Sequence, residues 1–208
     1  MELVLVRHGE TEYNRADLFR GRVDLPLNDR GEEQARAAAV YLSGLDFEAF
    51  RSSPLQRAMR TAEVIAEPHG GEVLPLEHFI DVDYGHWSGK SADEIRKEWP
   101  REFAIWADDP DRAVFPGGEA VREVRERLCE GLESLAGEHE GTVLLVGHKL
   151  INRITVCIVL GLPTVGIWRV EQTNAAINFI SHGERGWVLK RLNDTGHLRG
   201  IESNEQQT

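Results

Sequence analysis

The sequence predicts an α/β fold with a mostly parallel central sheet, helices on both faces and a small helical insertion over the ligand-binding end of the sheet. Short apolar runs alternate with amphipathic stretches, which is typical of strands that alternate with helices. The run LVLV at 3–6 is apolar without alternation, as expected of a central parallel strand buried on both faces. The stretch 81–116 breaks this rhythm with three tryptophans and the tripeptide PGG, and we interpret it as the helical insertion.

Apolar runs mark the predicted strands, and helical spacing of apolar residues marks the predicted helices. A helix over 29–44 opens with Asn28 or Asp29 as its capping residue, and one over 54–67 carries Pro54 in its first turn. A longer helix is expected at about 117–136. The predicted strands are, in chain order, 3–6, 47–53, 73–77, 142–147, 175–180 and 187–192.

Length and composition limit the classes of protein that fit. The 208 residues fit a single domain at 1–200, with 81–116 as a cap and 201–208 as a polar tail. A formal charge of −11 argues against nucleic acid and against an anionic membrane as partners, because both require a basic surface. The two cysteines fit neither a metal motif nor a disulfide framework, and the N-terminus lacks the long apolar run of a signal peptide. We therefore predict a cytoplasmic protein.

Cationic side chains follow the ends of the predicted strands. Arg7 and His8 come directly after the first strand, and His148 comes directly after TVLLVG. Arg57 falls in the first turn of the helix that follows FRSS. Ligands of open α/β sheets bind beyond the carboxyl ends of the strands, so these four side chains are expected to converge in one crevice. Guanidinium groups and helix N-termini suit phosphate, and an imidazole held against a phosphate is a competent nucleophile.

Four segments of the sequence also carry a family resemblance. Taken together and in this order, they resemble the histidine phosphatase superfamily, which has the phosphoglycerate-mutase-like fold. The resemblance covers about residues 2–150, and a weaker similarity is found in QTNAAIN and LNDTGHL near the C-terminus. The segments are LVRHGETEYN at 5–14, SSPLQRAMRTA at 52–62, YGHWSG at 84–89 and LLVGH at 144–148.

The resemblance implies a phosphomonoesterase that acts on a small phosphorylated metabolite without a metal or other cofactor. His8 would attack the phosphorus and form a phosphohistidine, which water then hydrolyses. Arg7, Arg57 and His148 would hold the phosphoryl oxygens, and Asn14 would donate a hydrogen bond to them. A carboxylic acid would protonate the leaving oxygen and then activate the water.

The acid is the position at which this sequence departs from the family pattern. The family usually carries a glutamate four residues before the glycine of its G-x-W motif, and here Asp81 stands four before Gly85. Aspartate is shorter by one methylene, roughly 1.5 Å of reach, and misplacement by about 1 Å can lower a rate on the order of 10²-fold. We predict Asp81 as the acid, with Asp83 as the rival.

Substrate and assembly stay open at this stage. The C-terminal segment with His197 resembles metal-independent phosphoserine phosphatases and cobalamin-pathway (alpha-ribazole) phosphatases, but Tyr84 stands where the phosphoserine enzymes carry a second histidine. Gly21, Tyr84 and His197 are predicted to contact the substrate, and Lys90 and Lys149 are further candidates. A phosphoglycerate mutase-type phosphotransferase, a non-catalytic phosphate-binding protein and a homodimer paired through a sheet edge are the remaining alternatives.

Overall fold

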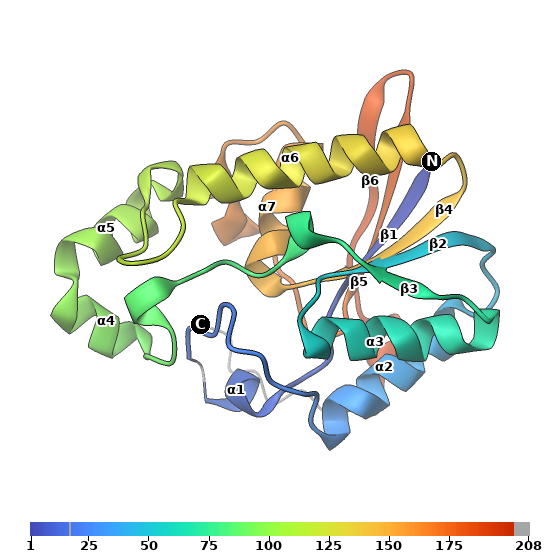
Figure 1. The fold of residues 1–208 in the computed structure, drawn as a ribbon, viewed down its shortest axis with the longest axis horizontal. Helices are drawn as coiled ribbons and strands as arrows, with labels where there is room; N and C mark the ends of the chain where they lie inside the picture. Colours follow the sequence, from blue (N-terminus) through green and yellow to red (C-terminus); the bar gives the residue numbers. More distant parts are fainter. Residues whose placement is uncertain (17, 202–208) are drawn as a thin grey trace.

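The computed structural model describes residues 1–16 and 18–201, and the strands within this part of the chain form one six-stranded sheet (Figure 1). The sheet order is β3-β2-β4-β1-β5-β6. Neighbours are parallel from β3 to β1, whereas β5 runs antiparallel to β1 and pairs with β6 as a hairpin. The predicted mostly parallel sheet is therefore confirmed. The strands are β1 (Glu2–Arg7), β2 (Phe47–Ser52), β3 (Val73–Pro75), β4 (Thr142–Gly147), β5 (Ile177–Gly183) and β6 (Gly186–Asp194).

Helices cover both faces of this sheet, as Figure 1 shows. Residues of β1 alternate between two separate apolar cores, as the period of two in a strand requires. Leu3 and Leu5 pack toward α6 (Val121–Glu138) and α7 (Lys149–Val159). The alternate residues Val4 and Val6 pack toward the helices of the other face, α2 (Asp29–Leu42) and α3 (Gln56–Ala66). The predicted helices on both faces are confirmed.

The ends of the elements differ in places from the predicted ends. Asn28, and not Asp29, caps α2, because its side chain accepts a hydrogen bond from the backbone of Gly31 at 2.9 Å. Helix α3 begins at Gln56 instead of Pro54, since Leu55 still has extended backbone angles. Strand β5 begins at Ile177, two residues later than predicted, because Ala175 adopts a positive φ of 55°.

The segment 81–116 holds two helices, α4 (Ala92–Glu98) and α5 (Pro100–Asp108), at one end of the molecule (Figure 1). A reciprocal cap between Ser91 and Glu94 begins α4. The first residues of the segment, 81–84, belong to no helix or strand, are buried except for Asp83, and lead into a 3₁₀ turn at 85–87. The tail predicted at 201–208 lies outside the described residues apart from Ile201. No helix in the described part of the chain is long and apolar enough to cross a membrane.

Candidate active site

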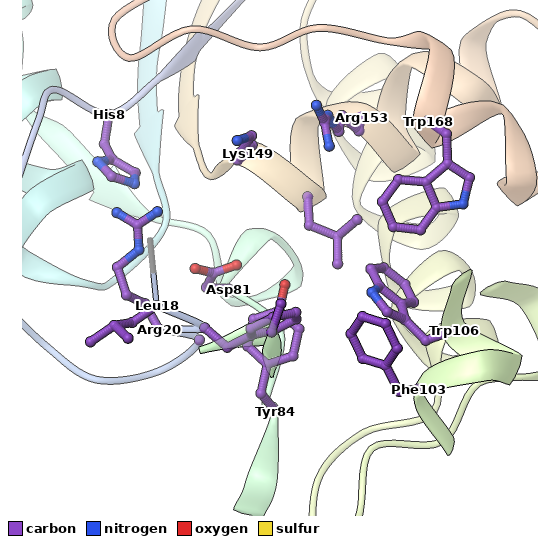
Figure 2. A pocket seen from close by; sticks show the side chains of 14 residues that line it. His8, Leu18, Arg20, Asp81, Tyr84, Phe103, Trp106, Lys149, Arg153 and Trp168 are labelled. Atoms are coloured by element: carbon purple, nitrogen blue, oxygen red, sulfur yellow. The ribbon is translucent and has the colours of Figure 1, made fainter. Parts of the chain in front are cut away.

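His8 stands one residue beyond β1 and is held by hydrogen bonds on its backbone and on its ring. Its carbonyl accepts hydrogen bonds from the backbone of Ala175 at 3.2 Å and from Asn174 Nδ2 at 3.1 Å. Its ring Nδ1 lies 2.6 Å from the carbonyl oxygen of Gly9. A carbonyl only accepts, so Nδ1 must carry the proton, and Nε2 of the neutral ring keeps its lone pair. The ring is almost fully buried and lines a cavity (Figure 2).

Arg57 lies in the first turn of α3, as predicted, and both of its terminal nitrogens donate hydrogen bonds. Its Nη2 donates to the Gly21 carbonyl at 2.8 Å and to Asp81 Oδ2 at 2.8 Å, while Nη1 donates to the Val23 carbonyl at 2.9 Å. A side chain at Gly21 would place Cβ 2.5 Å from the Val82 carbonyl oxygen, and φ at Gly21 is +51°. Glycine is therefore required where this loop meets the arginine.

His148 and Asp81 lie beside His8 at the carboxyl end of the sheet. The two imidazole rings have centroids 5.2 Å apart. His148 Nε2 is 2.7 Å from the Ser53 hydroxyl, and its Nδ1 is 3.6 Å from Asp81 Oδ2. Arg7 is buried behind them, with Nη1 donating to the Gln172 carbonyl at 2.5 Å. His8, His148, Asp81 and Arg57 thus lie together, and the Arg7 charge is close enough to lower the pKa of His8.

Burial changes the pKa values of His8, His148 and Asp81. It lowers the pKa of both His8 and His148 well below 6.5, and the Arg57 charge lowers each further. Burial also raises the pKa of the Asp81 carboxyl, although the Arg57 guanidinium opposes that rise. The Arg57–Asp81 ion pair favours the ionised acid, but desolvation outweighs it. The site consequently favours neutral imidazoles beside a carboxyl that binds a proton more readily than in water.

The two candidate acids have different surroundings. Asp81 lines the cavity, and its Oδ1 accepts from the backbone of Val82 at 2.9 Å. Asp83 closes a turn instead, since its Oδ1 accepts from the backbone of Gly85 at 2.9 Å. Asp83 is also absent from the described lining of the cavity. The geometry therefore favours Asp81 over its rival.

The cavity has a volume of about 350 Å³ and extends from His8 to the insertion (Figure 2). His8, Arg20 and Asp81 lie at one end, and aromatic residues of the insertion lie at the other. Arg20 and Arg153 line it but were not singled out by the sequence reasoning. Arg153 follows Lys149 by four residues on α7, so helical spacing was a usable signal for it. Arg20 sits in a loop and offered no such signal.

The remaining predicted contacts divide between the cavity and its surroundings. Tyr84 lines the cavity, and burial raises its pKa, so its hydroxyl stays a neutral donor. Asn14 Oδ1 accepts from the Thr11 backbone at 2.9 Å, and its buried Nδ2 has no hydrogen-bond partner among the described residues. Lys90 pairs with Glu98 at 3.1 Å and does not line the described cavity.

His197 is not brought to the cavity. Its ring stacks on Tyr41, with centroids 5.4 Å apart and an interplanar angle of 25°. Its Nε2 lies 3.1 Å from the carbonyl oxygen of Ala175. Since the backbone of Ala175 in turn contacts His8, the structure places His197 behind the loop that supports His8, and not among the described residues facing a ligand.

Comparison with known proteins agrees with this fold and this geometry. The model of the histidine phosphatase superfamily, branch 1, matches residues 3–195. Phosphoserine phosphatase 1 of Hydrogenobacter thermophilus is 35% identical over 95% of this chain and 94% of its own. A protein named "Probable phosphoglycerate mutase GpmB" from Serratia proteamaculans is 31% identical over 95% of both chains. The alpha-ribazole phosphatase structure from Shigella flexneri superimposes with a TM-score of 0.85 at 25% identity, covering 93% of this chain and 96% of that one.

The chain therefore belongs to branch 1 of the histidine phosphatase superfamily. It is an enzyme of the histidine-type phosphatase class, which confirms the resemblance found in the sequence.

Proposed function

We propose that this enzyme is a metal-independent phosphomonoesterase that hydrolyses a small phosphorylated metabolite through a phosphohistidine. One observation carries the proposal. The Gly9 carbonyl fixes the His8 proton on Nδ1, so that Nε2 is available as a nucleophile beside a buried carboxyl, Asp81. Both groups line the same cavity.

In the first step, His8 Nε2 forms a bond to phosphorus as the bond from phosphorus to the ester oxygen breaks. Protonated Asp81 gives its proton to the leaving oxygen, so that the alcohol departs neutral and Asp81 becomes a carboxylate. Burial favours this role, because it raises the pKa of the Asp81 carboxyl. The product of the step is a phosphoryl group on His8.

In the second step, water attacks the phosphorus and the bond between nitrogen and phosphorus breaks. The Asp81 carboxylate accepts a proton from that water, which regenerates the acid, and phosphate leaves with the hydroxyl. His8 Nε2 recovers its lone pair while Nδ1 keeps its proton on the Gly9 carbonyl. The cycle therefore consumes one water and returns the enzyme unchanged.

Cationic groups offset the charge that develops on the phosphoryl oxygens. Arg57, Arg7 and Arg20 are the charges that act on His8, since each lowers its pKa. Arg57 is positioned by two backbone carbonyls, of Gly21 and Val23, and it holds Asp81 at the same time. One guanidinium thus holds the proposed acid and places a positive charge near His8.

The relatives indicate what the substrate resembles. Their names include a phosphoserine phosphatase and an alpha-ribazole phosphatase, both of which act on small phosphate esters. A phosphoserine-like or alpha-ribazole phosphate-like ester is therefore the substrate class proposed here. The relative named as a phosphoglycerate mutase supports a second candidate, a phosphotransferase that returns the phosphoryl group to its substrate.

Phosphate release from small esters in the presence of EDTA tests the proposal. The parent enzyme is expected to release phosphate, and His8→Ala is expected to be inactive, because it lacks the nucleophile. His86→Ala is a matched control, since His86 is exposed on the insertion and does not line the described cavity. Isomerisation of 3-phosphoglycerate without net phosphate release would favour the mutase. Tight binding of esters without turnover would favour a non-catalytic phosphate-binding protein.

A further inference from the structure

The cavity is larger than a phosphate needs. Its volume of about 350 Å³ corresponds to roughly a dozen water-sized groups at ~30 Å³ each. The proposed phosphoryl site occupies the end at His8, Arg20 and Asp81 (Figure 2). Most of the volume therefore remains for the alcohol part of the ester. The residues that line this volume indicate which chemical groups the alcohol carries.

The wall opposite His8 is aromatic. Phe103 and Trp106 come from α5, and Trp168 comes from the 3₁₀ helix Thr164–Arg169 (Figure 2). The two indoles meet edge to face, with centroids 5.0 Å apart and an interplanar angle of 71°. Trp106 is buried, whereas Trp168 is 45% exposed. A flat apolar group that covered the Trp168 face would remove this surface from water.

A pair of cations lies along the cavity between its two ends. Lys149 and Arg153 line the cavity one helical turn apart on α7, and Figure 2 shows both charged groups on the side that joins His8 to Trp168. They are distinct from the cations of the phosphoryl site. The phosphoryl-site cations are Arg57, Arg7 and Arg20, each of which lowers the pKa of His8.

The lining offers little to a positively charged substrate group. Among the described residues of the cavity wall, Asp81 is the single carboxylate, and Arg57 already holds it at 2.8 Å. An ammonium group on the alcohol would lie near the two like charges of Lys149 and Arg153. An anionic group would meet two cations in a protein whose net charge is −11.

Building on the proposed phosphatase function, we propose that the alcohol part of the substrate combines a flat aromatic or apolar body with a second anionic group, such as a carboxylate. The anion pairs with Lys149 and Arg153, and the flat body lies against Trp168 and the α5 aromatics. In this proposal these residues bind the leaving group, whereas His8 and Asp81 carry out the phosphoryl and proton transfers. An ester with both features is therefore preferred over one with either alone.

Four synthetic phosphates of primary alcohols separate the two features. Ethyl phosphate has neither, phosphoglycolate has the anion, benzyl phosphate has the ring, and 4-carboxybenzyl phosphate has both. We expect kcat/KM to rise roughly ten- to hundredfold from benzyl to 4-carboxybenzyl phosphate, as for a hydrogen bond to a charged group. The gain should appear mainly in KM, because the anion is remote from the reacting bond.

Variants assign each feature to its residues. In Lys149→Gln/Arg153→Gln the ratio of kcat/KM for 4-carboxybenzyl over benzyl phosphate should fall to near one. In Trp168→Ala the ratio for benzyl over ethyl phosphate should fall roughly tenfold, a value typical of lost stacking. Arg122→Gln is the matched control, since Arg122 is 75% exposed on α6, and both ratios should stay at the parent values. Thermal unfolding of each variant checks that it folds.

The outcomes separate this inference from the proposed function. Equal kcat/KM for all four esters, or ratios that survive the variants, would overturn the inference and leave the phosphatase intact. Faster hydrolysis of phosphoserine than of 4-carboxybenzyl phosphate would overturn it as well. An enzyme that releases phosphate from none of these esters, nor from an aryl phosphate, would instead reject the phosphomonoesterase itself.

Discussion

In the proposed mechanism Asp81 would carry two roles that depend on its protonation. Its carboxyl is buried, which raises its pKa, and it contacts both Arg57 at 2.8 Å and His148 Nδ1 at 3.6 Å. A glutamate would extend farther toward the substrate, so the shorter aspartate requires the ester oxygen to approach this wall more closely. Arg57 and the Val82 backbone fix the carboxyl and leave it little freedom to turn.

Replacing each acid separately tests the assignment. Asp81→Asn should lower kcat by about 10²–10⁴-fold, the usual contribution of a general acid. Asp83→Asn is the matched control and should retain kcat within a few fold, because Asp83 caps the turn at Gly85 outside the described cavity wall. Stopped assays on ethyl phosphate measure both. A full rate in Asp81→Asn would move the role to Asp83 or to another group.

The pH dependence should report the same residues. The reaction needs neutral His8, whose pKa is lowered well below 6.5, so the acid limb of kcat/KM should lie below that pH. It also needs protonated Asp81, so the rate should decline as pH rises through the raised pKa of this carboxyl. The residual activity of Asp81→Asn, followed from acid to alkaline pH, should lack this decline. Its persistence would assign the alkaline limb elsewhere.

At the scale of elements, α2 supports the loop that follows His8. A side chain at Gly9 would place Cβ 2.5 Å from the Gly31 carbonyl oxygen, so the loop and the start of α2 are in close contact. Asn28 caps this start through Gly31, and its Nδ2 also donates to Glu10 Oε1 at 3.0 Å. The same side chain therefore begins the helix and ties the loop to it.

Removing this cap should destabilise the protein modestly. Asn28→Ala should lower the free energy of unfolding by about 1 kcal/mol, as for other N-caps. Ser43→Ala at the exposed far end of α2 is the control and should change it by less than about 0.5 kcal/mol. Urea unfolding of the three proteins measures both effects. An equal decrease in the free energy of unfolding of the two variants would contradict a specific stabilising effect of the Asn28 cap.

At the scale of the whole molecule, the two buried histidines of the site make stability depend on pH. His8 and His148 have pKa values lowered by burial, whereas in the unfolded chain each titrates near 6.5. Below that pH, and above their folded pKa values, the unfolded chain binds more protons than the folded one. The free energy of unfolding must then fall as pH falls.

The size of this effect follows from the number of protons. Two histidines should lower the free energy of unfolding by up to about 3 kcal/mol per pH unit below pH 6.5. Urea unfolding of the parent and of His8→Gln/His148→Gln between pH 7 and pH 5 checks it. The double variant should show a shallower pH dependence, because its glutamines do not titrate. Identical slopes would contradict the buried neutral state.

A structural feature can be predicted from the sequence when the residues that determine it are close together along the chain. The run at 3–6 and TVLLVG are continuous apolar runs, which only a strand covered on both faces accommodates, and the side chains that follow them had to share one edge. Arg20, Arg153 and Trp168 meet at the cavity from three separate segments, and no spacing along the chain brings them together. Their convergence depends on how the loop of Arg20, helix α7 and the 3₁₀ helix Thr164–Arg169 are arranged around the cavity.

His197 shows that a local sequence resemblance can also predict a contact that the structure does not contain. Its segment resembles those of phosphoserine and alpha-ribazole phosphatases, and on that basis His197 was predicted to contact the substrate, but a local sequence pattern does not determine which neighbour a ring will contact. Tyr41 from α2 offers a stacking surface 5.4 Å away, and the Ala175 carbonyl offers an acceptor. These tertiary contacts hold the ring behind the His8 loop, and neither is visible in the order of residues.

The position of Asp81 at the start of the insertion has a consequence for how such enzymes diversify. Its carboxyl is anchored on α3 by Arg57, and so by the sheet side of the molecule, while Phe103 and Trp106 stand on α5 within the insertion. A relative in which another sequence replaces α4 and α5 would keep the proposed acid and nucleophile in the same relative positions. The part of the apolar wall that Phe103 and Trp106 supply can then change by replacement of one segment, and grafting residues 92–108 from a relative is the corresponding route for engineering the shape of that wall.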